Sequence, residues 1–120
     1  MPRPWREKFR DAFRGLWLAI RLERSFAVHL PLAAAVLIAG IALRVSLVEA
    51  CILGVCVTLV LVAEMFNTAL ERLARTIDHE YKSDLAAALD IASGAVLTAA
   101  IGAALVGGAI FLSRVTALLG

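Results

Sequence analysis

Long stretches of aliphatic residues dominate this chain of 120 residues. Hydrophobic residues make up 62% of it, aromatic residues only 7%, and its mean hydropathy is +0.88. A soluble fold of this size has too little interior to cover so much apolar surface, whereas about 20 apolar residues are enough to cross a bilayer. The chain has room for three or at most four spans with short connections. The sequence therefore predicts a single all-α integral membrane domain over residues 1–120.

The distribution of charge and cysteine argues against several other classes of protein. The segment before residue 25 is dense in charge and holds no apolar stretch followed by a cleavage site, so we expect no secretory signal. Cys51 and Cys56 lie inside an apolar run, which favours packing over a disulfide or a metal site. Seven of the twelve Lys and Arg residues precede Phe26, and this clustering favours an anionic membrane face over nucleic acid.

Residues 4–25 have the pattern of an amphipathic helix lying at a membrane surface. Apolar residues recur at steps of four, three and four between Phe9 and Ile20, with arginines interspersed. Trp5 and Trp17 fit the headgroup zone, where an indole keeps its body in apolar surroundings and its N–H in water.

Three apolar segments follow, and we expect each to form a membrane-spanning helix. The first covers residues 27–48, and it continues past Arg44 if that side chain snorkels outward. The second covers residues 50–75, but only its first fourteen residues precede a charge, so it extends beyond the membrane as a cytoplasmic helix. The third covers residues 85–113 and is rich in Ala and Gly, which let helices approach closely.

Basic residues orient these segments by the positive-inside rule. Seven lie before the first span and Arg44 alone follows it, whereas Arg72, Arg75 and Lys82 lie before the third span. We therefore expect the N-terminus and the connection between the second and third spans to face the cytoplasm.

Glu64, Asn67 and Glu71 form the clearest candidate site, because a spacing of i, i+3 and i+7 places them on one helical face near the cytoplasmic end of the second span. A carboxylate inside a membrane is costly without a partner, so Glu64 is the candidate general base, within reach of a lipid hydroxyl. Glu71 would bind Mg²⁺ as a hard oxygen ligand, and Asn67 would orient a nucleophile or a phosphate. Alternatively, Glu71 pairs with Arg75 and Glu64 only holds the helices together.

Three further residues have more than one interpretation. Glu23 lies where the surface helix meets the first span, and it would either complete a cation site with Glu71 or lie on a solvated face among arginines. Asp90 opens the third span, where an isolated acid also serves as an N-cap or first-turn residue. His29 is more typical of a packed or interfacial histidine than of a metal ligand, because no second His or Cys lies at ligand spacing.

Three blocks of the sequence resemble the prokaryotic diacylglycerol and undecaprenol kinase family. Residues 64–71, EMFNTALE, are similar to the family signature E-x-x-N-[ST]-A-[ILV]-E. Residues 90–97, DIASGAVL, are similar to the segment that opens the third span of that family. The blocks stay in register over about residues 9–112, so the resemblance covers nearly the whole chain. A third block matches the end of the family's surface helix at Gly15, Glu23 and Phe26.

The resemblance implies a homotrimer of three-span subunits in a bacterial cytoplasmic membrane, with active sites shared between neighbours. Each site would transfer the γ-phosphate of ATP to a hydroxyl of diacylglycerol or undecaprenol at the cytoplasmic interface, without a P-loop. In the roles that the resemblance implies, Glu64 is the base, Glu23 and Glu71 bind Mg²⁺, and Asn67 and Asp90 belong to the nucleotide and metal site.

The chain departs from the family pattern where phosphate would bind. Leu89 stands where the family has a Lys before the aspartate, and Ala86 stands where a further Lys is common. Arg75 or Lys82, from the same cytoplasmic connection, would supply the missing positive charge to a phosphate. Two alternative functions remain at this stage: a relative without kinase activity that binds lipids or lipid phosphates, and a small transporter subunit in which Glu64 carries protons.

Overall fold

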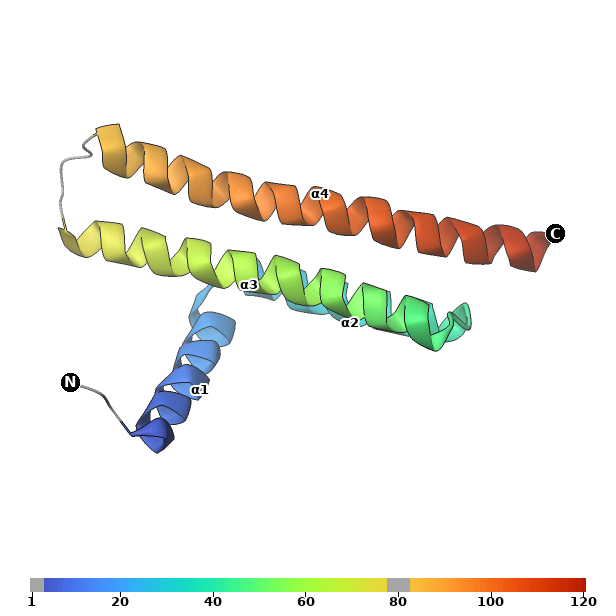
Figure 1. Cartoon of the computed structure of the whole chain (residues 1–120), viewed down its shortest axis with the longest axis horizontal. Coiled ribbons are helices and arrows are strands. Elements are labelled where there is room, and N and C mark those ends of the chain that lie inside the picture. The colour runs from blue at the N-terminus through green and yellow to red at the C-terminus, as the bar shows by residue number, and fades with distance from the viewer. Residues whose placement is uncertain (1–3, 78–82) are drawn as a thin grey trace.

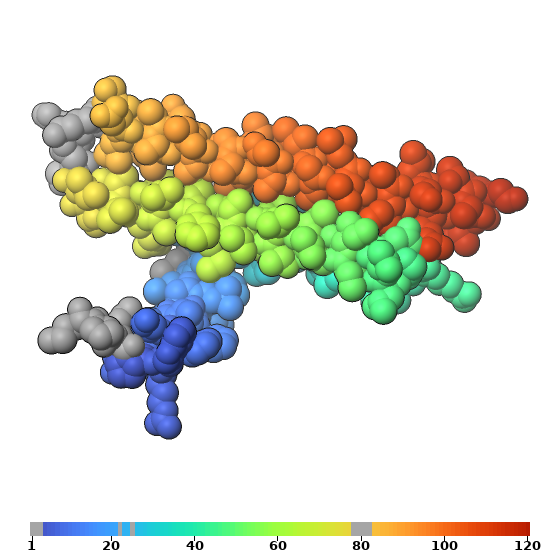
Figure 2. Space-filling model, viewed as in Figure 1, coloured from blue at the N-terminus to red at the C-terminus, as the bar shows by residue number. Residues whose placement is uncertain are grey.

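Four α-helices joined by short connections make up this computed structural model, which describes residues 4–77 and 83–120 (Figure 1). α3 and α4 lie side by side and antiparallel, α2 packs against α3, and α1 leaves the bundle at 95° to α2. Figure 2 shows α1 standing clear of the other three helices. Helices are the only regular secondary structure within the described ranges, so the all-α prediction is confirmed. In chain order the helices are α1 (Trp5–Leu22), α2 (Arg24–Ala42), α3 (Leu47–Ile77) and α4 (Ser83–Leu119).

α3 and α4 are each long and apolar enough to cross a membrane, and α1 with α2 forms a bent pair that would make a third span. At about 1.5 Å per residue, the 31 residues of α3 extend over about 46 Å and the 37 residues of α4 over about 55 Å. The hydrocarbon core of a bilayer is only about 30 Å thick, so both helices reach past it. The surface position of α1 and the trimeric assembly stay predictions.

Most apolar side chains of α3 and α4 point away from the bundle. Within the most apolar stretch of each helix, 11% of the α3 residues and 0% of the α4 residues are buried. Lipid tails or further protein would cover such a surface at little cost in free energy, whereas its exposure to water is unfavourable. The exposed aliphatic faces therefore agree with a membrane location.

The first predicted span continues past Arg44, whereas α2 ends at Ala42. Arg44 has a positive φ of 56°, which turns the chain out of the helix. The N–H of Arg44 donates to the carbonyl of Ile41 at 3.1 Å, and the N–H of Val45 donates to the carbonyl of Gly40 at 3.1 Å. These are the two hydrogen bonds of a Schellman C-cap, and they let α2 and α3 form a tight helical hairpin.

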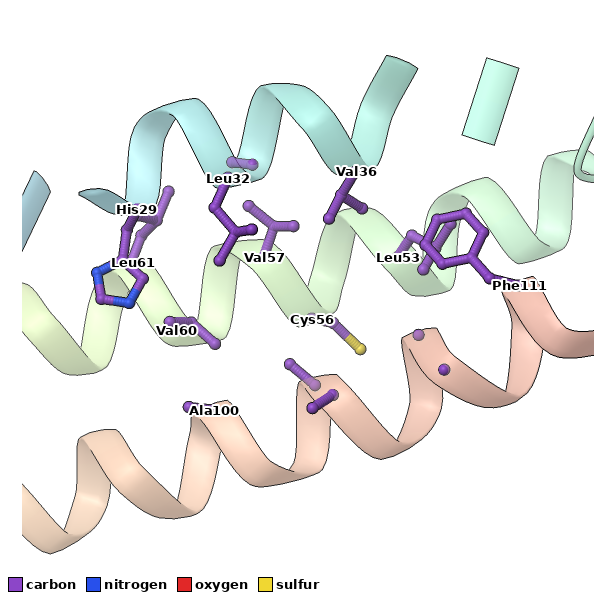
Figure 3. Close-up of a pocket in the computed structure, with 15 residues that line it drawn as sticks. His29, Leu32, Val36, Leu53, Cys56, Val57, Val60, Leu61, Ala100 and Phe111 are labelled. Carbon is purple, nitrogen blue, oxygen red and sulfur yellow. The ribbon is translucent and has the colours of Figure 1, made fainter. Parts of the chain in front are cut away.

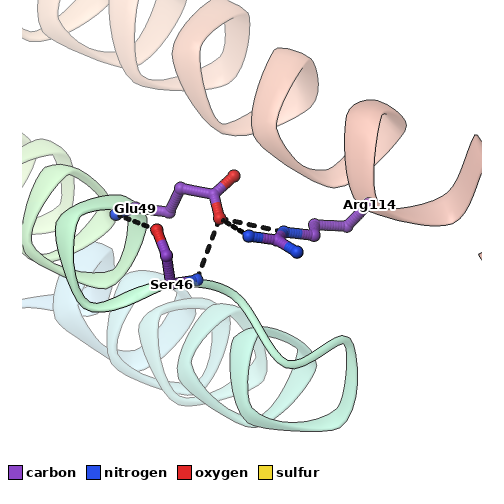
Figure 4. Close-up of polar contacts among 3 residues, drawn as sticks. All are labelled: Ser46, Glu49 and Arg114. Carbon is purple, nitrogen blue, oxygen red and sulfur yellow. Dashed lines mark hydrogen bonds and ion pairs between the residues drawn. The ribbon is translucent and has the colours of Figure 1, made fainter. Parts of the chain in front are cut away.

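A capping box starts α3 and also ties it to α4. The N–H of Ser46 donates to Oε1 of Glu49 at 2.9 Å, and the N–H of Glu49 donates to Oγ of Ser46 at 3.1 Å. Arg114 of α4 donates to the same carboxylate oxygen through Nε at 2.9 Å and also through Nη2 (Figure 4). One glutamate thus caps one helix and binds the end of its neighbour.

Leu53 is the apolar side chain at which three helices meet. It is 4% exposed, and its methyl groups lie 3.8 Å and 3.6 Å from the positions that a Cβ atom would take on Gly40 of α2 and Gly107 of α4. A Cβ atom at either glycine would be in ordinary van der Waals contact with this leucine, so α2 and α4 both pack closely against it. Together with the contact between Glu49 and Arg114, this packing sets the register of α3 against α4.

Candidate active site

Glu64 is a buried acid in the second half of α3. Its surface is 5% exposed, and Nδ1 of His29, from α2, lies 2.8 Å from its Oε2. A carboxyl group among apolar helices needs such a partner, because loss of water disfavours its charged form. The residue that the sequence singles out as a base is therefore buried and held from a neighbouring helix.

Asn67 and Glu71 continue this face of α3 toward its C-terminal end. Nδ2 of Asn67 donates to Oε1 of Glu71 at 3.0 Å, and both side chains are half-buried. The alternative ion pair between Glu71 and Arg75 is not formed by these two described side chains, and Glu71 instead accepts the hydrogen bond from Asn67. Oδ1 of Asn67 is buried and accepts no hydrogen bond from the described residues. Such an oxygen suits a cation or a donor from a bound molecule.

Glu23 lies in the break between α1 and α2, where its backbone is extended with φ −99° and ψ 128°. Arg72 of α3 donates to Oε1 of Glu23 through Nε at 3.0 Å and through Nη2 at 2.9 Å. This ion pair ties the start of α2 to α3 one residue beyond Glu71. Glu23 is therefore paired with a neighbouring helix, and its role as a metal ligand stays a prediction.

Two of the other predicted nucleotide-site residues, Asp90 and Arg75, lie near the same end of the bundle. Asp90 is exposed early in α4, and the antiparallel register of α3 and α4 puts it near the level of Glu71. Arg75 is exposed near the end of α3, and Lys82 lies outside the described residues. Within residues 4–77 and 83–120, no three or more His, Cys, Asp or Glu side chains gather into a group that could hold a metal ion. Binding of Mg²⁺ by Glu23 and Glu71 is thus still a prediction.

An apolar groove of about 330 Å³ opens between α2 and α4, with α3 as its floor. Its walls are aliphatic apart from His29, Cys56 and Phe111. Figure 3 shows His29 at one end of the groove, and Leu53 with Phe111 toward the other. The groove therefore runs along the membrane part of the bundle and meets the pair of His29 and Glu64 at its polar end.

Among the described residues, three polar contacts join helices through partners that the sequence did not predict. They join His29 to Glu64, Arg72 to Glu23, and Arg114 to Glu49. Ser46 and Glu49 carry a recognisable signal, since Ser-x-x-Glu is the pattern of a capping box. That box lies at the start of α3, and the sequence holds no comparable local signal for any of the three contacts between helices.

Comparison with known proteins extends over most of the chain. A profile of the family described as prokaryotic diacylglycerol kinase matches residues 10–111. A diacylglycerol kinase from Synechocystis sp. is 35% identical over 112 residues, which cover 92% of this chain but only 64% of that longer protein. An undecaprenol kinase from Bacillus subtilis is 34% identical over 108 residues, which cover 90% of this chain and 88% of that protein. Matches of this extent show that the chain belongs to the prokaryotic diacylglycerol kinase family.

Proposed function

We propose that this protein is a lipid kinase that transfers the γ-phosphate of ATP to the hydroxyl of a membrane lipid, diacylglycerol or undecaprenol. The observation that carries the proposal is the position of Glu64, a buried carboxyl group bound to His29 beside the polar end of an apolar groove. A lipid chain in this groove would bring its hydroxyl to the base from the membrane side. The names of the two relatives, a diacylglycerol kinase and an undecaprenol kinase, support the reaction and both acceptors.

The proposed reaction places one proton transfer on Glu64. Its carboxylate accepts the proton of the lipid hydroxyl while the hydroxyl oxygen forms a bond to the γ-phosphorus. The bond from that phosphorus to the β–γ bridging oxygen breaks, and ADP leaves with that oxygen. The proton then passes from Glu64 to water, so a lipid alcohol and ATP give a lipid phosphate, ADP and one proton.

The oxygen atoms of this face of α3 fit Mg²⁺ that arrives with the nucleotide. Glu71 offers a carboxylate, and Asn67 offers a buried oxygen that lacks a donor among the described residues. Glu23 would add its Oε2, since both hydrogen bonds from Arg72 go to Oε1. Mg²⁺ commonly takes only one or two protein carboxylates beside phosphate and water, so a larger acidic cluster is not required. When bound, the ion neutralises charge on the phosphates.

Cations near the end of α3 would hold the phosphates in place of the Lys that Leu89 replaces. Arg75 is exposed there and offers a guanidinium that can bind a phosphate through two donors. Lys82, by its place in the chain, would add a second positive charge. Asp90, near the level of Glu71, would complete the polar lining of the nucleotide site.

We also propose the assembly and location that the family resemblance implies, a homotrimer in the bacterial cytoplasmic membrane with its N-terminus in the cytoplasm. The apolar aromatic residues of α1 support its place at the membrane surface, since Trp5 is 72% exposed and Trp17 is 59% exposed. Such side chains favour the headgroup zone over water.

The activity is tested with purified protein in lipid micelles, labelled ATP, Mg²⁺ and either lipid alcohol. We expect labelled lipid phosphate from the wild type and a loss of at least about 100-fold in Glu64→Gln, which keeps the shape of the side chain but removes the base. Glu49→Gln is the matched control, because it makes the same change at the opposite end of α3. A folded wild type that labels neither lipid would refute the proposal and favour a relative without kinase activity.

A further inference from the structure

His29 differs from Arg72 and Arg114, which also contact an acid on another helix in the described part of the chain. The acids Glu23 and Glu49 are each held by an arginine, and their side chains are both 22% exposed. Glu64 is held by a histidine, and its side chain is 6% exposed. The two more exposed acids are thus paired with a permanent cation, and the buried acid is paired with a weakly basic ring.

This difference matters for a carboxylate that has to accept a proton. A guanidinium beside Glu64 would stabilise its anionic form permanently and oppose protonation. A histidine ring, unlike a guanidinium, carries no permanent charge. It can therefore fix the orientation of the carboxylate while leaving it able to act as a base.

The position of His29 makes it accessible from the groove. His29 lines the groove with 27% of its side chain exposed, while Oε2 of Glu64, which it contacts, is wholly buried. The 2.8 Å contact between Nδ1 and Oε2 restrains the rotation of the carboxyl group about its last bond, and Oε2 accepts no hydrogen bond from the described residues. Because Oε2 is enclosed, an incoming hydroxyl would meet the second oxygen, Oε1.

We propose that His29 is a positioning residue, which holds Oε2 of Glu64 so that Oε1 receives the proton of the lipid hydroxyl. This inference deepens the proposed kinase function and rests on it. It adds to the reaction a residue on α2, outside the signature face of α3.

The test compares three variants in the lipid kinase assay, with kcat and the KM values for lipid and ATP measured separately. We expect His29→Ala to lower kcat about 10- to 100-fold with both KM values within about twofold of the wild type, because orientation of the base is lost and binding is not. His29→Asn should recover most of kcat, since its amide nitrogen can take the place of Nδ1. Leu32→Ala, in the same groove wall, removes apolar contact only and should raise the KM for lipid with little change in kcat.

A merely structural role for His29 predicts different results. It would lower the free energy of unfolding and leave kcat of the folded His29→Ala protein unchanged. The proposed role predicts that His29→Ala lowers kcat when Glu64 is present and causes no further loss of kcat once Glu64 has been replaced by Gln.

Two outcomes separate this inference from the proposed function. Transfer by the wild type with an unchanged kcat in folded His29→Ala overturns the role of His29 alone, and no transfer by the wild type overturns both. Should His29→Ala fail to fold, His29→Asn and His29→Leu are compared: a kcat near that of the wild type in the Asn variant and more than about tenfold lower in a folded Leu variant supports the role, and equal kcat values in the two contradict it.

Discussion

The ion pair between Glu23 and Arg72 makes it possible to separate a metal-binding role of Glu23 from a structural one. Both hydrogen bonds from Arg72 reach Oε1 of Glu23, at 3.0 Å and 2.9 Å, and the two side chains are 22% (Glu23) and 54% (Arg72) exposed. Exposed pairs of this kind contribute about 0.2 to 1 kcal/mol. If that whole contribution supported the active arrangement, its loss would lower kcat/KM by about fivefold at most.

The assay is lipid phosphorylation by Glu23→Gln and Arg72→Gln over a range of Mg²⁺ concentrations. Either change breaks the same ion pair, but only the first removes a carboxylate. We expect Arg72→Gln to stay within about fivefold of the wild type and to keep its Mg²⁺ requirement. Glu23→Gln should raise the Mg²⁺ concentration for half-maximal activity by at least about tenfold, because loss of groups that support a metal site commonly costs that much.

Matching behaviour of the two variants would refute a metal-binding role of Glu23. If both lost activity by the same modest factor, with the same Mg²⁺ requirement as the wild type, Glu23 would serve only to tie the start of α2 to α3. A double variant that is no worse than either single one would strengthen that conclusion, since the two residues would then act as one unit.

Two further predictions concern stability, measured as the free energy of unfolding in mixed detergent micelles. Arg44→Gly should stabilise the protein by about 0.5 to 1 kcal/mol, because glycine relieves about 1 to 2 kcal/mol of left-handed backbone strain and this exceeds its larger loss of conformational entropy on folding. Arg44→Ala, which keeps a side chain at the positive φ of 56°, should give no such gain. Leu53→Ala should lower the free energy of unfolding by about 1 to 2 kcal/mol, which is less than in a soluble core because the unfolded chain in a micelle is also in apolar surroundings. Leu59 is the control, since its side chain is 57% exposed, and an equal loss in Leu59→Ala would contradict the packing role of Leu53.

The helices could be predicted from the sequence because a bilayer leaves a chain of this composition little alternative. Backbone polar groups in lipid have to be paired within the segment, so long apolar runs become helices, as in α3 and α4. The end of α2 could not be predicted in the same way. Arg44 has no glycine-like character, yet it takes the positive φ that stops the helix.

The candidate site was predictable only within one helix. The spacing of Glu64, Asn67 and Glu71 is local, and it places them on one face of any regular helix. Their partners from other helices depend on tertiary packing, so His29 reaches Glu64 only after α2 has folded back against α3. A residue such as His29, with no motif around it, acquires its meaning from that contact.

α3 also fixes how deep in the leaflet each step of the proposed chemistry takes place. Seven residues separate Glu64 from Glu71, which corresponds to a rise of about 10 Å along the helix axis. A lipid alcohol whose hydroxyl oxygen lies above or below the level of Glu64 would have to bend its chain or deform the bilayer around it. Under the proposed roles, α3 would select lipid alcohols first by the depth of their hydroxyl oxygen in the leaflet and only then by the shape of their headgroup.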